Sequence, residues 1–387
     1  MDLLKLFSLL FTDYTVRNVA LGSAIVGAVS GTIGSFALLR KQSLMGDAMS
    51  HAALPGIALV FIITGLKTPV ALFLGAFGAA WLGAILIIVI TRYTRVKEDS
   101  SLGIVLAVFF GFGLVLLSWI QRNRGANQAG LDKFLFGRAA AIVEADVIVM
   151  AVIATITIIL VALFWKEFKL LAFDVDFAAS LGFPVRVLDV LLTTLIVMGI
   201  VVGLQVVGVV LMAALIVAPA AAARQWTDRL STMVVISAGF GAFSGAVGAL
   251  LSSLARGLST GPIIVLTASA IAIFSLFFAP NRGLIWDWLR QRSNRNRLAQ
   301  DRVMEALYIM ASNHGDPTHP HGLENLAAVL PHYNVKATLE KLGERGLVSM
   351  RGKYWSLTDQ GVQIVEELQN DTHAAGEGSM LEGKAST

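Results

Sequence analysis

Nine stretches of this 387-residue chain are apolar over lengths that reach or approach the width of a lipid bilayer. A helix crosses the hydrocarbon core with about 20 apolar residues, and there it pairs its backbone groups internally. The chain is 56% hydrophobic and 14% charged, against roughly a quarter charged in soluble domains. We therefore predict an all-α polytopic membrane protein with spans at 16–39, 47–65, 69–91, 101–120, 145–165, 187–203, 206–223, 231–255 and 261–279. Because only a few residues around Gln205 separate the sixth and seventh stretches, eight or nine spans are compatible.

Basic residues indicate the orientation of these spans. Cytosolic loops carry an excess of Lys and Arg. The loops after the first, third, fifth and seventh stretches hold the larger share, namely Arg40, Lys41, Arg92, Arg95, Lys97, Lys166, Lys169, Arg186, Arg224 and Arg229. We expect an outside N-terminus, a cytosolic C-terminus and a place in the cell membrane, with no removable signal peptide. The chain has no cysteine, which excludes disulfides and thiolate metal ligands.

The composition changes after Pro280. We expect a transmembrane domain over 1–282, a basic interfacial linker over 283–296, a cytosolic domain over 297–370 and a disordered tail over 371–387. In the linker, Trp286 and Trp288 suit the lipid headgroups. The cytosolic domain is predicted to be a small α+β fold resembling a winged helix, with helices in "DRVMEALYIMAS", "LENLAAVL", "NVKATLEKLGERGLV" and "DQGVQIVEEL" and a two-stranded wing in "SMRGKYWSLT".

Two features of the cytosolic domain bear on its partners. The candidate recognition helix "KATLEKLGERGLV" holds three basic residues against Glu340 and Glu344, whereas a DNA reader has a basic face. This disfavours DNA and favours a protein-interaction or regulatory role. The loop "NHGDPTHPHG" contributes His314, Asp316, His319 and His321, and it is either a cytosolic metal site or a solvated turn.

Asp47 and His51 lie at the start of the second apolar stretch, and His51 is the only histidine among the first 313 residues. Residues four apart share one face of a helix, and a carboxylate with an imidazole suits manganese, iron or zinc. Two ligands are too few, so a second chain would have to complete the set. The alternative is structural: Asp47 caps the helix and His51 bonds to a neighbouring carbonyl.

Several stretches in order resemble the permease subunits of manganese/zinc/iron ABC importers. They are "LLRKQSLMGDAMSHAALPGIAL" at 38–59, "FLFGR" at 134–138, "FDVDFAASLGFPV" at 173–185, "VGVVLMAALIVAPAAAAR" at 207–224 and "GPIIVLTASAIAIFSLFFAP" at 261–280. The resemblance implies the fold of a type II ABC importer permease. It also implies that Asp47 and His51 pass the metal, and that a short helix carrying Phe173, Asp174, Asp176, Ala178 and Gly182 couples the permease to an ATPase.

The same resemblance implies the partners and the cargo. The expected partners are an ABC ATPase subunit, an extracytoplasmic metal-binding protein, a second permease chain (identical or paralogous) and membrane lipid. The cargo is a divalent metal ion, with manganese favoured over zinc and iron, and no permanently bound cofactor is expected. The chain is not expected to be an enzyme. The tail segment "GSMLEGK" has phosphate-loop spacing, but Ala385 stands where Ser or Thr would hold magnesium, so ATP hydrolysis is assigned to the partner.

Two other functions stay open on the residues. A proton-coupled secondary metal transporter would use the same Asp47 and His51 and need no coupling helix. A membrane-tethered metal-responsive regulator would use the bundle as its sensor.

Overall fold

A computed structural model describes residues 13–65, 68–123, 137, 142–254 and 258–368. The predicted tail at 371–387 and the stretch 134–138, apart from Gly137, lie outside these residues. The chain divides into two compact units, Met1–Leu284 and Ile285–Thr387.

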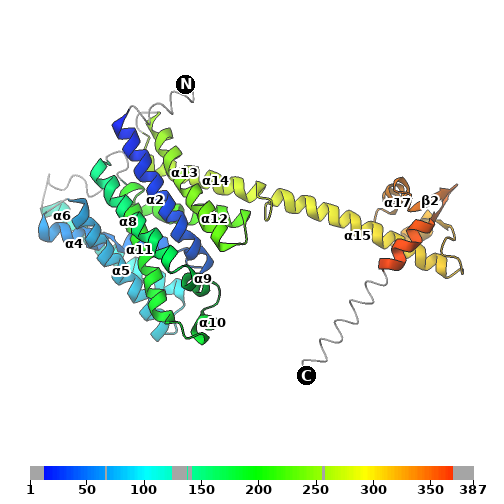
Figure 1. The fold of residues 1–387 in the computed structure, drawn as a ribbon, viewed down its shortest axis with the longest axis horizontal. Helices are drawn as coiled ribbons and strands as arrows, with labels where there is room; N and C mark the ends of the chain where they lie inside the picture. The colour runs from blue at the N-terminus through cyan, green and yellow to red at the C-terminus, as the bar shows by residue number, and fades with distance from the viewer. Residues whose placement is uncertain (1–12, 66–67, 124–136, 138–141, 255–257, 369–387) are drawn as a thin grey trace. The chain divides into compact units, whose positions relative to one another are not determined.

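The first unit is a bundle of helices (Figure 1). Among the described residues, nine segments are long and apolar enough to cross a membrane. They are α2 (Tyr14–Leu39), α3 with α4 (Met45–Ala52 and Leu54–Thr64), α5 (Pro69–Tyr93), α6 (Glu98–Asn123), α8 (Glu144–Leu163), α11 (Val185–Val206), α12 (Val209–Trp226), α13 (Leu230–Ser253) and α14 (Thr260–Phe278). The predicted all-α membrane fold is confirmed. Gly208, with φ of 87°, separates α11 from α12, so these segments number nine and not eight.

The second span differs from the single helix predicted over 47–65. It is broken at Ala53 into α3 and α4, and Pro55 lies in the first turn of α4. Proline has no backbone N–H, so it cannot donate to the carbonyl of His51 four residues earlier. The break therefore falls two residues after His51.

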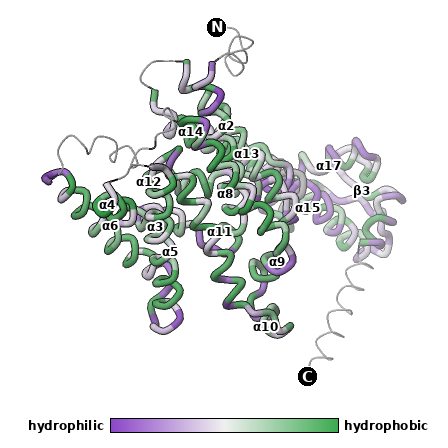
Figure 2. The backbone as a smooth tube through the Cα atoms, turned by 60° about the vertical axis from the view of Figure 1, so that its left-hand side comes forward, coloured by the Kyte–Doolittle hydropathy of each residue, from purple (hydrophilic) through white to green (hydrophobic). Residues whose placement is uncertain are grey.

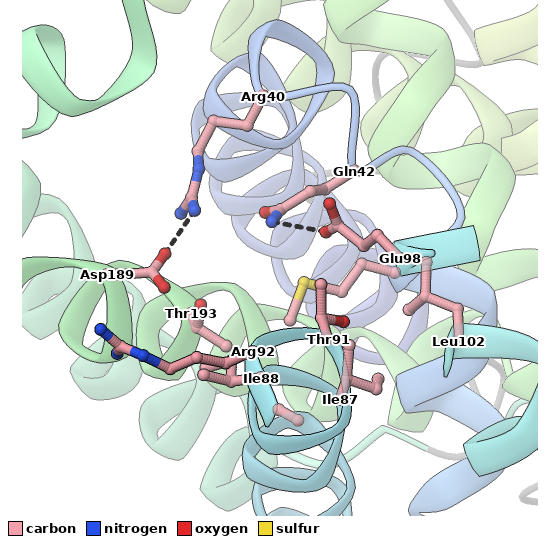
Figure 3. Close-up of a pocket in the computed structure, with 12 residues that line it drawn as sticks. Arg40, Gln42, Ile87, Ile88, Thr91, Arg92, Glu98, Leu102, Asp189 and Thr193 are labelled. Atoms are coloured by element: carbon pink, nitrogen blue, oxygen red, sulfur yellow. Dashed lines mark hydrogen bonds and ion pairs between the residues drawn. The ribbon is translucent and has the colours of Figure 1, made fainter. Parts of the chain in front are cut away.

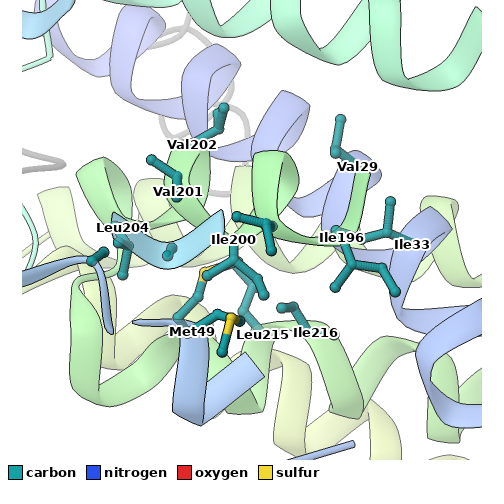
Figure 4. Close-up of a cluster of buried hydrophobic side chains, with 14 of the residues drawn as sticks. Val29, Ile33, Met49, Ile196, Ile200, Val201, Val202, Leu204, Leu215 and Ile216 are labelled. Carbon is teal, nitrogen blue, oxygen red and sulfur yellow. The ribbon is translucent and has the colours of Figure 1, made fainter. Parts of the chain in front are cut away.

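A continuous apolar core fixes the position of α3 (Figure 4). Met49 of α3 is fully buried, and so are its neighbours Ala48 and Ala52. Figure 4 shows Met49 among side chains of three other helices, namely Val29 and Ile33 of α2, Ile196 and Ile200 of α11, and Leu215 and Ile216 of α12. One face of α3 is thereby anchored in the bundle, and the face bearing Asp47 and His51 is oriented by this packing.

Helices α2 and α13 lie in backbone contact along a seam of small residues. A Cβ on Gly27 or Gly241 would overlap the carbonyl oxygen of the other glycine, and a Cβ on Gly31 would overlap that of Ser237. Ser237 also donates a hydrogen bond of 2.7 Å to the carbonyl of Gly31. Small residues allow membrane helices to approach this closely.

Two short helices, α9 (Trp165–Phe173) and α10 (Val175–Ser180), follow α8. Phe36, near the C-terminal end of α2, contacts Trp165 and Phe168 of α9 edge-on, with ring centroids 5.9 and 6.1 Å apart. The pair of short helices therefore lies at the end of the bundle where α2 finishes (Figure 1). By the Lys and Arg bias, this is the predicted cytosolic end.

The second unit has its own core and a small sheet. It contains most of α15 (Leu284–Ser312), then β1 (His321–Gly322), α16 (Leu323–Val329), α17 (Val335–Glu344), β2 (Val348–Arg351), β3 (Tyr354–Leu357) and helical residues 359–368. The strands are antiparallel in the order β1-β3-β2, and Met350 of β2 faces Trp355 of β3 in register. The predicted helices and hairpin are present, and the winged-helix assignment stays a prediction.

The stretch predicted as a linker continues without a break into the first helix of this unit. No Gly or Pro occurs between Leu284 and Ser312, so nothing interrupts the helical hydrogen bonds of α15. Figure 2 shows the contrast in hydropathy between the largely hydrophobic bundle helices and the more hydrophilic α15.

Candidate functional site

Asp47 and His51 face each other on α3. Nε2 of His51 lies 3.5 Å from Oδ1 of Asp47, as their i, i+4 spacing predicts. The imidazole packs edge-on against Phe110 of α6, with ring centroids 4.6 Å apart. The side chain of His51 is 16% exposed and that of Asp47 is 40% exposed. The pair thus has a covered imidazole and an accessible carboxylate.

The two structural roles considered for this pair do not occur among the described residues. α3 has Leu44 as its N-cap and no side-chain capping hydrogen bond, so Asp47 does not cap the helix. Nδ1 of His51 is buried and has no hydrogen-bond partner there, so the ring does not bond to a neighbouring carbonyl. A buried nitrogen without a partner costs free energy, and a ligand in the vicinity would offset that cost.

A pocket of about 390 Å³, lined by both polar and apolar side chains, lies between the end of α2, the start of α6 and α11 (Figure 3). Arg40 at the end of α2 pairs with Asp189 of α11, and Nε2 of Gln42 donates a hydrogen bond of 2.8 Å to Glu98 of α6. Met45, two residues before Asp47, also lines it. Sequence reasoning missed this site because its charged partners are far apart in the chain and no local pattern links them.

The predicted coupling segment forms the short helix α10. Asp174 caps it by accepting a hydrogen bond of 2.8 Å from the N–H of Phe177, and Gly182, with φ of 81°, follows its end. Phe173 and Phe177 are exposed, as is Asp176, whereas Ala178 is buried against its own chain. The prediction places Phe173 on this helix, whereas Phe173 is the last residue of α9, on the other side of the Asp174 cap. Helix α10 therefore presents Phe177 as its exposed aromatic side chain, and Ala178 is not part of that exposed face.

The predicted histidine loop brings three rings together in the second unit. The ring centroids of His314 and His319 are 4.5 Å apart, those of His314 and His321 are 5.2 Å apart, and those of His319 and His321 are 5.4 Å apart. Burial, followed by the neighbouring histidines, lowers the pKa of His321 and favours its neutral ring.

Asp316 has a different role from the three histidines. Its Oδ1 accepts hydrogen bonds of 2.9 and 2.7 Å from the N–H and hydroxyl of Thr318, and the backbone bond of these lowers the pKa of Asp316 most. It holds the turn that carries His319. Across the part of the chain that the structure describes, no three His, Asp or Glu side chains are arranged to hold a metal ion as they stand.

Comparison with known proteins agrees with this architecture. The ABC 3 transport family matches residues 12–279. The manganese transport system membrane protein MntC of Bacillus subtilis is 42% identical over 345 residues, covering 89% of this chain and 79% of the relative. The zinc transport system membrane protein TroC of Treponema pallidum is 47% identical, covering 73% of this chain and 95% of the relative.

A solved structure of PsaBC from Streptococcus pneumoniae in complex with Fab has a TM-score of 0.65 and 31% identity to this chain. The match covers 75% of this chain and all of that chain. The match to the Bacillus protein is longer than the whole first unit, so it includes part of the second. The family match spans the helical bundle from α2 to α14 and includes the Asp47 and His51 pair, and on this evidence the chain belongs to the ABC 3 transport family.

Proposed function

We propose that this chain is the membrane-spanning permease subunit of an ABC importer that moves a divalent transition-metal ion into the cytoplasm. The observation that carries the proposal is the Asp47 and His51 pair, which lies within a candidate membrane-spanning segment and, across the described part of the chain, lacks the structural partners that would otherwise explain it. Ionisable residues inside membrane helices are costly and mark pathways for ions. Family membership and the manganese, zinc and chelated-iron names of relatives support the same reading.

Two such pairs, one from each of two permease chains, form the proposed translocation site. The accessible carboxylate of Asp47 would face a second permease chain, identical or paralogous, and a carboxylate exposed to lipid would be unfavourable. Oxygen and nitrogen ligands without thiolates suit Mn²⁺, Fe²⁺ and Zn²⁺, and manganese is favoured. An extracytoplasmic metal-binding protein would deliver the ion.

The energy for transport comes from a separate ATPase subunit in this proposal. The exposed Phe177 of α10 and the exposed Phe173 at the end of α9 would dock on that subunit at the cytosolic side of the cell membrane, with the C-terminus also cytosolic. Family membership favours this arrangement over a proton-coupled carrier or a membrane-tethered regulator.

Uptake of radioactive manganese by cells or proteoliposomes containing the assembled transporter tests the role of the pair. Asp47→Ala and His51→Ala should each reduce ATP-dependent uptake about tenfold or more, because each removes at least one ligand from the site. Asp99→Ala, which removes an exposed carboxylate at the start of α6, is the matched control and should transport normally.

Competition with unlabelled Zn²⁺ and Fe²⁺ in the same assay assigns the metal. Normal uptake by both site variants at wild-type expression would reject Asp47 and His51 as the path. Uptake that needs a proton gradient and no ATP would reject the ABC mechanism.

A further inference from the structure

The three clustered histidines of the second unit form a feature that transport does not use. His314 follows the C-terminal end of α15, His319 lies in the next turn, and His321 is the first residue of β1. All three ring pairs lie between 4.5 and 5.4 Å apart, so the rings form a closed triangle. We propose that His314, His319 and His321 form a binding site for a zinc-class divalent cation.

The hydrogen bond of the His314 ring indicates which of its nitrogens is available to a metal. Nδ1 of His314 lies 3.0 Å from the carbonyl oxygen of Met310. A backbone carbonyl that holds Nδ1–H fixes the tautomer and leaves the lone pair of Nε2 for a metal.

His321 supplies an independent indication of a ligand. The residue is 7% exposed, and its Nε2 is buried without a hydrogen-bond partner among the described residues. A buried polar atom left unpaired is unfavourable, so a native structure calls for a reason to keep it. Coordination of a cation by Nε2 provides that reason.

The spacing of the rings agrees with tetrahedral coordination. Three imidazoles bound tetrahedrally at about 2.1 Å from one ion place their ring centres about 5 Å apart. The rings of His314 and His319 are now stacked, with 10° between their planes, so their nitrogens do not converge. His314 is exposed and His319 is half-exposed, so the reorientation that brings their nitrogens towards His321 would not displace the core. Solvent would fill the fourth position.

The ligand chemistry selects the metal. Three imidazoles suit zinc, and divalent affinity for such a site is higher for Zn²⁺ than for Mn²⁺. Bound zinc would join the end of α15 to strand β1, which pairs with β3 through His321 and Trp355. The site would therefore respond to zinc even where the transported ion is manganese. This inference does not depend on the proposed transport function.

The test is zinc binding by the full chain, purified in detergent without a polyhistidine tag. The background chain carries Asp47→Ala and His51→Ala, so that the proposed translocation site contributes nothing. After removal of metal with EDTA, Zn²⁺ is titrated in competition with a fluorescent chelator. We expect one saturable ion per chain, and His314→Ala or His319→Ala should weaken it about tenfold or more. His332→Ala, an exposed histidine of the same unit, is the matched control and should bind normally.

X-ray absorption at the zinc edge gives a readout independent of affinity. We expect imidazole nitrogens at about 2.0–2.1 Å. Both tested histidines lie outside the core, so their loss should leave the far-ultraviolet circular dichroism unchanged. No saturable zinc, unchanged affinity in the His314 and His319 variants, or a spectrum without imidazole scattering would each overturn the site. Manganese binding as tight as zinc would overturn the choice of metal class.

Discussion

At the scale of single residues, the most informative feature of the bundle is the position of the Asp47 carboxylate. Asp47 lies three residues into a membrane-spanning segment, and its side chain is 40% exposed in the isolated chain. His51 lies beside it, and one of its ring nitrogens has no hydrogen-bond partner among the residues that the structure describes. One chain would thus contribute two ligands to the proposed site, which is why that site requires a second permease chain.

Substitution by alanine should affect stability differently at two glycines of α13, Gly241 and Gly239. Gly241→Ala places a Cβ against the carbonyl of Gly27 and should lower the free energy of unfolding by about 1–3 kcal/mol. Gly239→Ala, on the same helix, meets open space and should be neutral or stabilising by up to about 1 kcal/mol. Thermal unfolding in detergent, followed by fluorescence, measures both. Equal thermal stabilities of the two variants would show that the contact between α2 and α13 tolerates an added methyl group.

At the scale of elements, the short helix α10 differs from the rest of the bundle. Its ends are defined by the Asp174 cap and by Gly182, and its outer face carries Phe177, while the exposed Phe173 is the last residue of α9. Six residues cannot form a stable helix alone, so packing on the bundle through buried Ala178 must support it. In the proposed transporter, such a helix would transmit movement only while it is packed on the bundle on one face and on the ATPase subunit on the other.

A charge on the outer face of α10 should uncouple the proposed transporter. Phe177→Glu should abolish co-purification of the ATPase subunit and metal uptake, because it buries a carboxylate in an apolar contact. Val143→Glu is the matched control, since Val143 is as exposed as Phe177 but lies at the N-terminal end of α8. Retention of the ATPase by Phe177→Glu would mean that another loop makes the contact.

The elements divide sharply into those that local sequence predicts and those that it does not. Long apolar runs predict the spans, and the i, i+4 spacing of Asp47 and His51 predicts their contact. The break at Ala53 has a local signal in Pro55, but the uninterrupted apolar run predicts one continuous span. The Arg40 and Asp189 pair had none, since 149 residues separate its members and only the packed bundle brings them together.

At the scale of the whole molecule, each of the two units has its own hydrophobic core, so each can be stable independently of the other. The first unit closes with α14, and the second has its own buried cluster around Val303, Leu307, Leu326, Leu339 and Leu342. No residue is shared between the two clusters. Each unit should therefore unfold in its own transition.

Removal of residues 297–387 tests this independence. The remaining bundle should express, elute as a single species in size-exclusion chromatography and keep the thermal transition of the membrane unit, because all its core residues are retained. Differential scanning calorimetry of the full chain should show a further transition that the truncated chain lacks. Aggregation of the truncated chain would indicate that the second unit supports folding of the first.

The glycine seam between α2 and α13 also has a mechanical consequence. Where backbone touches backbone, no side chain remains to change rotamer and absorb a sliding movement. The two helices should therefore move together as one rigid body while the transporter alternates between its open states. Crosslinking α2 to α13 should therefore leave transport intact. The conformational change of each cycle would then fall on α3, whose helix is already interrupted at Ala53, two residues after His51.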